Sequence, residues 1–527
     1  MKTLYYGGSI LPLDRERTVE ALLTCQGKIV ALGSLDQLEP LARDARKVSL
    51  EGHAMLPAFV DGHSHITAVA QTLGLAQLSG AKSLWEIGER IKAFREKWSI
   101  PDGEWVIGFG YDQNLLREGR HPTKEDLDRV LPQCPVMVTH ASGHMGTVNS
   151  LGLERLGLTQ DTPDPAGGKL GRGPDGSLTG YLEEAAFTDM GSRIPRDPQQ
   201  ALKNLQRAQQ LYFSQGITTI HEGLTRATEW ELLESASQQG ILQGDVAAYV
   251  DIQDSAQLLE QHREYLGTYR NRLKIAGYKL FLDGSPQGRT AWMTQPYTGK
   301  AAYRGYPVHK DHEVMHFLEQ ALDQEIQIAV HCNGDAAAEQ LLRCYETLWR
   351  RNPKNIRPIM VHAQFLRPDQ VPRLKPLGMV ASFFVAHVFH WGDVHIRNLG
   401  QSRAESMSPA KTALDQGIVF DFHQDSPVIP PNMLETLWCA VCRVTREGTV
   451  LGPSQRLTPF QGLQAITGNA AWALFEENQK GTLAPGKHAD LVILDKDPLS
   501  CPPQELRHLQ VLETIKEGKT VYQAPRS

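Results

Sequence analysis

The chain has 527 residues, of which 41% are hydrophobic and 22% are charged, with a net charge of −6 and seven cysteines. These values are ordinary for a globular protein and exclude a basic nucleic-acid-binding surface, a polybasic membrane patch and a disulfide scaffold. The N-terminus carries no apolar signal-peptide region, and no segment reaches the ~18 apolar residues that a membrane helix needs. We therefore expect a protein of the reducing cytoplasm that binds neither nucleic acid nor membrane.

Short β-strands are predicted at both ends of the chain. Residues 1–55 alternate apolar segments with glycine and polar turns, and residues 476–527 have the same character. We predict that the two ends assemble one small composite β-sandwich domain around a larger domain of residues 56–475.

The middle of the chain alternates short apolar runs with amphipathic segments. Near-continuous apolar strands that alternate with helices are typical of a parallel sheet covered by helices, and eight such units favour a closed (β/α)8 TIM-like barrel. The eight predicted strands cover residues 54–60, 216–221, 245–252, 274–283, 326–332, 357–363, 378–385 and 417–423.

Residues 66–215 interrupt this rhythm after the first strand. They contain two further strand-like runs, at 104–110 and 134–144, and a glycine-rich stretch that is typical of a hairpin. We predict a large insertion in the barrel. It could shape a pocket or form a dimer contact, and the sequence leaves a homo-oligomer open.

Metal-ligating residue types follow several of the predicted strands. Barrel enzymes build their sites where strands end, and two histidines one residue apart on an extended strand point to the same face. Alone, such a pair, or a single histidine after a strand, is more often packed in a core than bound to a metal. Their coincidence on five strands instead predicts a metal site formed by His63, His65, Lys279, His331, His362 and Asp425.

The sequence resembles the metal-dependent amidohydrolase superfamily, in particular its amidohydrolase-3, or YtcJ-like, branch. The resemblance runs from residue 50 to about residue 498 and includes LPAFVDGHSH, HASGHMGTVNS, GITTIHEG, YKLFLDGSPQGRTA, VHCNGDAA, VHAQ, DSPV and KGTLAPGKHADLVILD.

The resemblance implies a role for each candidate ligand. His63 and His65 match the histidine pair that holds one metal, and His331 and His362 match the ligands of a second. Lys279 matches a lysine that is N6-carboxylated in many relatives and bridges two metals, although a mononuclear site without it stays open. Asp425 matches an aspartate that binds a metal and transfers the proton. Many relatives have Ser-Asp-Trp-Pro here, whereas this chain has Gln424-Asp425-Ser426-Pro427.

The function implied is hydrolysis of a small molecule at a carbon–nitrogen bond other than a peptide bond (amide, N-formyl, N-acyl or cyclic amide) by metal-activated hydroxide. Zn²⁺, one or two per chain, is the expected cofactor because the ligands mix imidazole and carboxylate. Hydrolysis of an ester or lactone by the same site, or a non-catalytic scaffold that kept the fold, are the alternatives. The predicted substrate-binding residues are His144, His221, His387 and Trp391.

Overall fold

The structure is a computed structural model that describes residues 2–194 and 197–525. The chain forms two compact units, one made of Met1–Val69 with Gln206–Ser527 and the other of Ala70–Leu205, and each is described by itself. Among the described helices, none combines the length and the apolar character needed to cross a bilayer.

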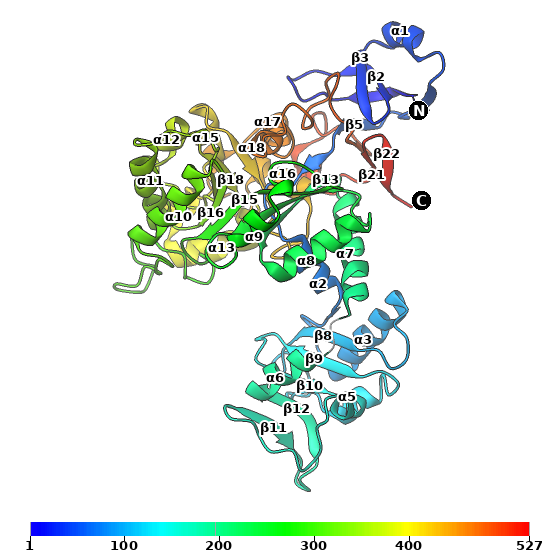
Figure 1. The fold of residues 1–527 in the computed structure, drawn as a ribbon, viewed down its shortest axis with the longest axis vertical. Helices are drawn as coiled ribbons and strands as arrows, with labels where there is room; N and C mark the ends of the chain where they lie inside the picture. Colours follow the sequence, from blue (N-terminus) through cyan, green and yellow to red (C-terminus); the bar gives the residue numbers. More distant parts are fainter. Residues whose placement is uncertain (1, 195–196, 526–527) are drawn as a thin grey trace. The chain divides into compact units, whose positions relative to one another are not determined.

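The larger unit contains an eight-stranded sheet in the order β19-β18-β17-β16-β15-β14-β13-β6, in which every neighbouring pair is parallel (Figure 1). The Gly62 amide donates to the Phe422 carbonyl at 3.3 Å, so the two outermost strands of this order also meet. The strands are β6 (Phe59–Val60), β13 (Ile217–Thr225), β14 (Asp245–Asp251), β15 (Leu273–Phe281), β16 (Ile328–Cys332), β17 (Ile359–His362), β18 (Val380–Phe383) and β19 (Phe420–Phe422).

Burial explains why these segments are strands. Nearly every residue of β14, β17 and β18 is buried, as expected where both faces of a parallel sheet are covered. Helices follow the strands along the chain: α2 (Ile66–Leu73), α7 (Pro198–Phe213), α8 (Ala227–Gln238), α9 (Gln257–Gln261), α10 (Asp311–Asp323), α11 (Asp335–Trp349), α12 (Val371–Leu374), α13 (His387–Leu399), α14 (Gln401–Glu405), α15 (Ala410–Asp415), α16 (Met433–Cys442), α17 (Pro459–Ala465) and α18 (Gly468–Ala473).

The first predicted strand, residues 54–60, is divided between two sheets, which corrects the sequence interpretation. Residues Ala54–Pro57 form β5, which pairs with β20 (Leu491–Leu494) in the terminal sheet, and only Phe59–Val60 joins the parallel sheet. Pro57 has no amide hydrogen. The Ala58 amide donates to the carbonyl of Asp490, which precedes β20 of the terminal sheet. The Phe59 amide donates to the carbonyl of Gly216, which precedes β13 of the parallel sheet, so the chain passes from one sheet to the other between these two residues.

Strands from both ends of the chain form the terminal sheet, where the blue and red strands of Figure 1 meet. Its order is β22-β21-β20-β5-β1-β2-β3, with β4 beside β1. All eight are connected by hydrogen bonds, because β1 pairs with β2, β4 and β5. The remaining bounds are β1 (Lys2–Ile10), β2 (Val19–Cys25), β3 (Lys28–Gly33), α1 (Leu35–Leu38), β4 (Arg46–Ser49), β21 (Val511–Lys516) and β22 (Lys519–Gln523).

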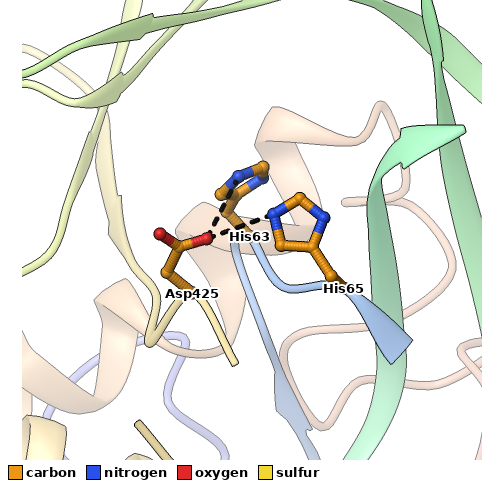
Figure 2. Close-up of side chains that lie close together, drawn as sticks. All are labelled: His63, His65 and Asp425. Carbon is orange, nitrogen blue, oxygen red and sulfur yellow. Dashed lines mark ion pairs between the residues drawn. The ribbon is translucent and has the colours of Figure 1, made fainter. Parts of the chain in front are cut away.

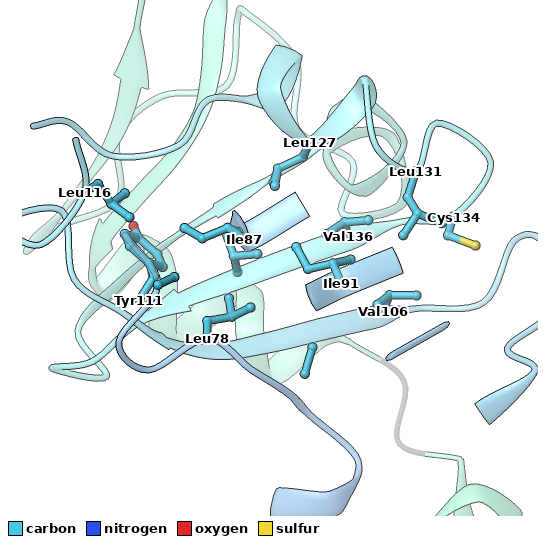
Figure 3. Packing of buried hydrophobic residues seen from close by; sticks show 13 residues of the cluster. Leu78, Ile87, Ile91, Val106, Tyr111, Leu116, Leu127, Leu131, Cys134 and Val136 are labelled. Atoms are coloured by element: carbon cyan, nitrogen blue, oxygen red, sulfur yellow. The ribbon is translucent and has the colours of Figure 1, made fainter. Parts of the chain in front are cut away.

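The smaller unit, Ala70–Leu205, has its own six-stranded sheet, in the order β11-β12-β10-β9-β8-β7. Ile87 and Ile91 of helix α3 pack with Val106 and Val136 of the sheet (Figure 3). The run 104–110 overlaps β8, which extends one residue further, the run 134–144 contains β9, and the glycine-rich stretch forms the β11–β12 hairpin. The bounds are β7 (Ala76–Gln77), α3 (Leu84–Trp98), β8 (Val106–Tyr111), α4 (Lys124–Asp128), β9 (Val136–His140), β10 (Met145–Val148), α5 (Ser150–Arg155), β11 (Gly168–Arg172), β12 (Leu178–Glu184) and α6 (Ala185–Arg193).

The unit Ala70–Leu205 lies within the predicted insertion 66–215, of which residues 195–196 are outside the described residues. Residues 1 and 526–527 of the predicted composite domain are also outside them.

A buried cluster of charges joins the start of β14 to the C-terminal part of the larger unit. Lys480 and Lys516 each donate to Asp245 at 2.6 Å, and Lys516 also donates to Asp490 at 2.7 Å. Burial alone would raise the pKa of Asp245, but the charges of Lys480 and Lys516 hold that pKa well below its usual range. Asp245 is therefore an ionised carboxylate that compensates two buried ammonium groups.

Removal of the Asp245 charge should destabilise the protein strongly. In Asp245→Asn the two lysines lose the carboxylate that both contact, and breaking a buried ion pair typically costs about 3–5 kcal/mol. We expect a loss of this size in the free energy of unfolding measured with urea. The matched control is Asp254→Asn, because Asp254 is half exposed and pairs with Arg226 at 3.6 Å, and a surface pair contributes about 0–1 kcal/mol. Equal effects of the two variants would contradict the assigned role of Asp245.

Candidate metal centre

His63 and His65 leave the end of β6 and meet Asp425, which follows β19 (Figure 2). Asp425 Oδ1 is 3.2 Å from His65 Nε2 and 3.6 Å from His63 Nε2. Backbone hydrogen bonds fix the two segments to each other, because the Asp425 amide donates to His63 at 3.0 Å and the His65 amide to Ser426 at 2.8 Å. Hydrogen bonds between the two backbone segments therefore keep His63 and His65 close to Asp425.

The geometry of these three side chains fits one divalent cation. Their ligand atoms all lie within 4.8 Å of one another, and within the described part of the chain no other group of three or more His, Cys, Asp or Glu meets that criterion. A tetrahedral zinc site with ligands at about 2.0–2.2 Å separates its ligand atoms by roughly 3.3–3.6 Å. The two measured separations from Asp425 Oδ1 are close to this range.

The other three candidate ligands lie beside this group. Lys279 Nζ is 3.1 Å from His63 Nε2, His331 Nδ1 is 3.0 Å from His362 Nε2, and the latter atom is 3.9 Å from Asp425 Oδ2. The parallel register produces this arrangement, because His331 pairs with Phe281 at the end of β15 and His362 pairs with Cys332 at the end of β16. The structure thus brings all six predicted ligands together at the carboxyl ends of their strands.

Protonation states in the cluster follow from burial and from Asp425. Burial lowers the pKa of Lys279 to about 8 and that of His331 to about 4, and it also places the pKa of His362 well below the ordinary value. Burial would also lower the pKa of His65, but hydrogen bonds with Asp425 and Glu222 raise it to about 9. His331 and His362 are therefore neutral, as metal ligands must be, whereas His65 carries a proton that a bound cation would replace.

Groups outside the six ligands orient two of the histidines. Glu222 Oε1 is 3.5 Å from His65 Nδ1, and Glu222 Oε2 accepts the Thr67 amide at 2.9 Å. A carboxylate on the second ring nitrogen of a histidine fixes the tautomer and ring orientation of a metal ligand. On the other side, Asn333 Nδ2 is 3.0 Å from His331 Nε2.

Asp283 anchors the loop that carries Asn333. Its carboxylate accepts the backbone amides of Asn333, Gly334 and Trp292 at 2.7–2.9 Å, and burial raises its pKa to about 7. Three converging amides are sufficient to fix the loop after β16, and through it the position of His331.

His423 also belongs to the cluster, although the sequence interpretation did not include it. His423 Nε2 is 3.0 Å from His362 Nδ1, and His423 Nδ1 is 2.9 Å from Ser382 Oγ. The available signal was the alternation Asp421, His423, Asp425, which places all three on one face of the extended chain.

The backbone is strained at two of the candidate ligands. His362 has φ 71° and Asp425 has φ 53°, in the left-handed region that residues other than glycine rarely adopt. Such strain persists only where the surroundings fix the conformation, and it concentrates at functional sites.

The four predicted substrate-binding residues have different surroundings. His221, on β13, is buried, and neither ring nitrogen has a hydrogen-bond partner among the described residues. His387 and Trp391 lie on α13 with ring centroids 4.5 Å apart. His144 belongs to the unit Ala70–Leu205, where its Nδ1 is 3.0 Å from Glu184 Oε2. Their contact with a substrate stays a prediction.

Comparison with known proteins identifies relatives along the whole chain. The N-substituted formamide deformylase of Arthrobacter pascens is 28% identical over 97% of this chain and 96% of its own. YtcJ of Bacillus subtilis, named among the amidohydrolases, is 28% identical over 99% of this chain and 100% of its own. The crystal structure of an uncharacterized metal-dependent hydrolase from Pyrococcus furiosus is 26% identical and superposes with a TM-score of 0.76, covering 95% of this chain and 100% of that one.

A family match covers most of the sequence. The pattern of the family described as "Amidohydrolase family" matches residues 46–522, which include all six candidate ligands and the whole parallel sheet but begin after β1, β2 and β3 of the terminal sheet. The resemblance seen in the sequence is therefore confirmed, and the chain belongs to this amidohydrolase family.

Proposed function

We propose that this chain hydrolyses a carbon–nitrogen bond in a small amide, N-formyl, N-acyl or cyclic amide compound with the help of a divalent cation. The observation that carries the proposal is the convergence of His63, His65 and Asp425, with ligand atoms within 4.8 Å of one another. The amidohydrolase family, the related formamide deformylase and the related metal-dependent hydrolase support it.

The eight parallel strands are proposed to form a closed (β/α)8 barrel, supported by the hydrogen bond between Gly62 and Phe422. The barrel domain is proposed to span residues 56–475, with the insertion 66–215, and residues 1–55 and 476–527 form the composite domain. In the structure β5 ends at Pro57, two residues beyond the first of these boundaries.

His63, His65 and Asp425 would hold the first cation, and His331 and His362 would hold a second. A divalent cation, for which Zn²⁺ is the natural choice with these ligands, lowers the pKa of a coordinated water toward neutrality and polarises a carbonyl oxygen. Lys279 is proposed to serve both positions as a carbamate. Its amine is fully buried with a pKa lowered to about 8, so a neutral form that reacts with CO₂ is accessible near neutral pH.

Asp425 is proposed to move the proton. Burial would raise its pKa, but the hydrogen bond with His65 holds it well below the ordinary value, so the carboxylate is ionised and able to accept a proton. Oδ1 faces His63 and His65, which leaves Oδ2, 3.9 Å from His362, as the oxygen free to act. Asp425 then delivers the proton to the leaving nitrogen, which an amide requires because an amide anion is a poor leaving group.

Gly223 gives His63 the space that it needs. A Cβ atom at residue 223 would lie 2.2 Å from His63 Cε1 and 2.8 Å from Nδ1. The backbone of β13 therefore packs directly against the imidazole of His63, in a space that no larger residue than glycine could share.

Hydrolysis should depend on a metal and on Asp425. After removal of metal with a chelator we expect no turnover of N-formyl and N-acyl amines, and full recovery with Zn²⁺ or Mn²⁺. Asp425→Asn should lower kcat/KM by about 10³-fold, because it removes both a ligand and the proton carrier. Asp415→Asn, at an exposed aspartate, is the control.

The substrate panel should include matched esters and lactones. Cleavage of esters and lactones alone would overturn the assignment of the C–N bond. A protein that binds less than one metal per chain, even after Zn²⁺ is added, would instead be a scaffold without this chemistry.

Replacement of Lys279 should change the metal stoichiometry. If Lys279 bridges two cations as a carbamate, Lys279→Met should bind one metal per chain where the wild type, prepared with bicarbonate, binds two. Elemental analysis of the purified proteins measures this difference. Two metals in both proteins would refute the bridging role, and one metal in both would establish a mononuclear site.

Gly223→Ala should weaken metal binding, because the added methyl group must displace the His63 ring. We expect at least a 10-fold loss of metal affinity, the size typical for disturbed ligand orientation. Gly191→Ala is the control, since a Cβ at residue 191 meets no atom within 4 Å. Circular dichroism of both variants establishes that they fold, and an unchanged affinity of a folded Gly223→Ala protein would show that His63 is not a ligand.

A further inference from the structure

Two histidines on helix α13 form a pair that the proposed chemistry has not used. His387 Nδ1 is 3.0 Å from His395 Nε2, and the two rings are parallel within 1° at a centroid separation of 5.3 Å. Both residues are buried, His387 with 3% of its surface exposed and His395 with none. They are eight positions apart on one helix, so the same face carries both.

The surroundings of His395 decide which nitrogen carries each proton. His395 Nδ1 is enclosed and has no hydrogen-bond partner among the described residues. Buried N–H groups without an acceptor are rarer in folded proteins than buried acceptors without a donor, so an enclosed nitrogen without a partner is better left unprotonated. Neutral His395 therefore places its single proton on Nε2 and donates it to His387 Nδ1.

This assignment fixes the state of His387. With Nδ1 acting as an acceptor, neutral His387 must carry its own proton on Nε2. His387 Nε2 has no hydrogen-bond partner within the described residues. Unlike His395 Nδ1, it is not fully enclosed by protein atoms. Burial keeps the pKa of His387 well below its ordinary value, so the ring stays neutral.

His387 lies next to the candidate metal centre. The ring of Phe384 has its centroid 4.4 Å from that of His387, 5.2 Å from that of His423 and 6.1 Å from that of His362. Trp391 also packs against His387, with its ring centroid at 4.5 Å, and the two aromatic neighbours restrict rotation of the imidazole. The Nε2–H donor is thus rigid and one aromatic ring away from the ligands.

We propose that His395 is a positioning residue that holds His387 in its Nε2–H tautomer, so that His387 presents a fixed N–H donor to the carbonyl oxygen of the substrate. The proposal rests on the hydrolase function proposed above for the role of the donor, but the tautomer itself does not depend on that function. A fixed donor of this kind stabilises the negative charge that develops on the oxygen in the transition state.

The variants are chosen to separate positioning from packing. His395→Phe keeps a flat ring but removes the donor, whereas His395→Gln keeps an N–H near the position of Nε2. His387→Phe removes the presented donor. His316→Phe, at an exposed histidine of α10, is the matched control.

With the metal-loaded enzyme and N-formyl and N-acyl amines, His387→Phe should lower kcat by about 10²-fold with little change in KM, as for loss of one oxyanion donor. We expect His395→Phe to lower kcat by about 10-fold and His395→Gln to recover it to within about 3-fold, because one hydrogen bond to a donor carries part of that effect. The double variant His387→Phe/His395→Phe should be no slower than His387→Phe, because His395 acts only through His387.

A second measurement reads the tautomer without turnover. In protein labelled with ¹⁵N-histidine, the signals of His387 are those lost in His387→Phe. In the wild type and in His395→Gln we expect a protonated Nε2 and an unprotonated, hydrogen-bonded Nδ1, and in His395→Phe the Nδ1 signal should shift as its donor is lost. A protonated Nδ1 in the wild type, or identical His387 signals and kcat in His395→Phe, would overturn the proposal. Absence of any hydrolysis by the wild type would overturn the function and the donor role, while the spectra would still decide the tautomer.

Discussion

The candidate metal centre depends on the interaction of the Asp425 carboxylate with the histidines around it. The two oxygens of Asp425 lie 3.2–3.9 Å from imidazole nitrogens of His65, His63 and His362, and its backbone amide is bound to the His63 carbonyl. The segments that follow β6 and β19 and the last residue of β17 therefore meet at one carboxylate. The left-handed backbone of Asp425 shows that the chain accepts local strain to keep it there.

A buried polar interior is stable only if each charge is compensated or suppressed. Near the ligands, burial keeps most histidines neutral, and Glu222 and Asp283 supply acceptors for neighbouring groups. At the other end of the same strands, Asp245 compensates Lys480 and Lys516. The larger unit thus buries charge in two clusters. A bound cation would compensate the charge of the candidate ligands around Asp425, whereas the charges of Asp245, Lys480 and Lys516 compensate one another.

Much of this arrangement could be predicted from the sequence. The apolar runs predicted the parallel strands, and the polar residues at their ends predicted which side chains come together, because parallel strands place their carboxyl ends at one edge. The exchange of partners at Ala58 could not be seen, since residues 54–60 form one unbroken apolar run and the change depends on pairing with distant β20. His423 was missed because a buried histidine at the end of a strand cannot be distinguished from core packing until His362 and Ser382 are known to face it. The connection of all eight terminal strands depends on the several partners of β1, which no local pattern encodes.

The pairing of β5 with β20 has a consequence for biosynthesis. Residues 54–57 have to wait for residues 491–494 before they can complete their hydrogen bonds, while the strand that follows them directly already belongs to the parallel sheet. On a ribosome that adds about 5–20 residues per second, this delay lasts tens of seconds, during which β5 presents an unpaired strand edge. The nascent chain thus carries an unpaired strand edge, which is prone to aggregation, for most of its translation. This is the stage at which binding of a chaperone would protect the chain most.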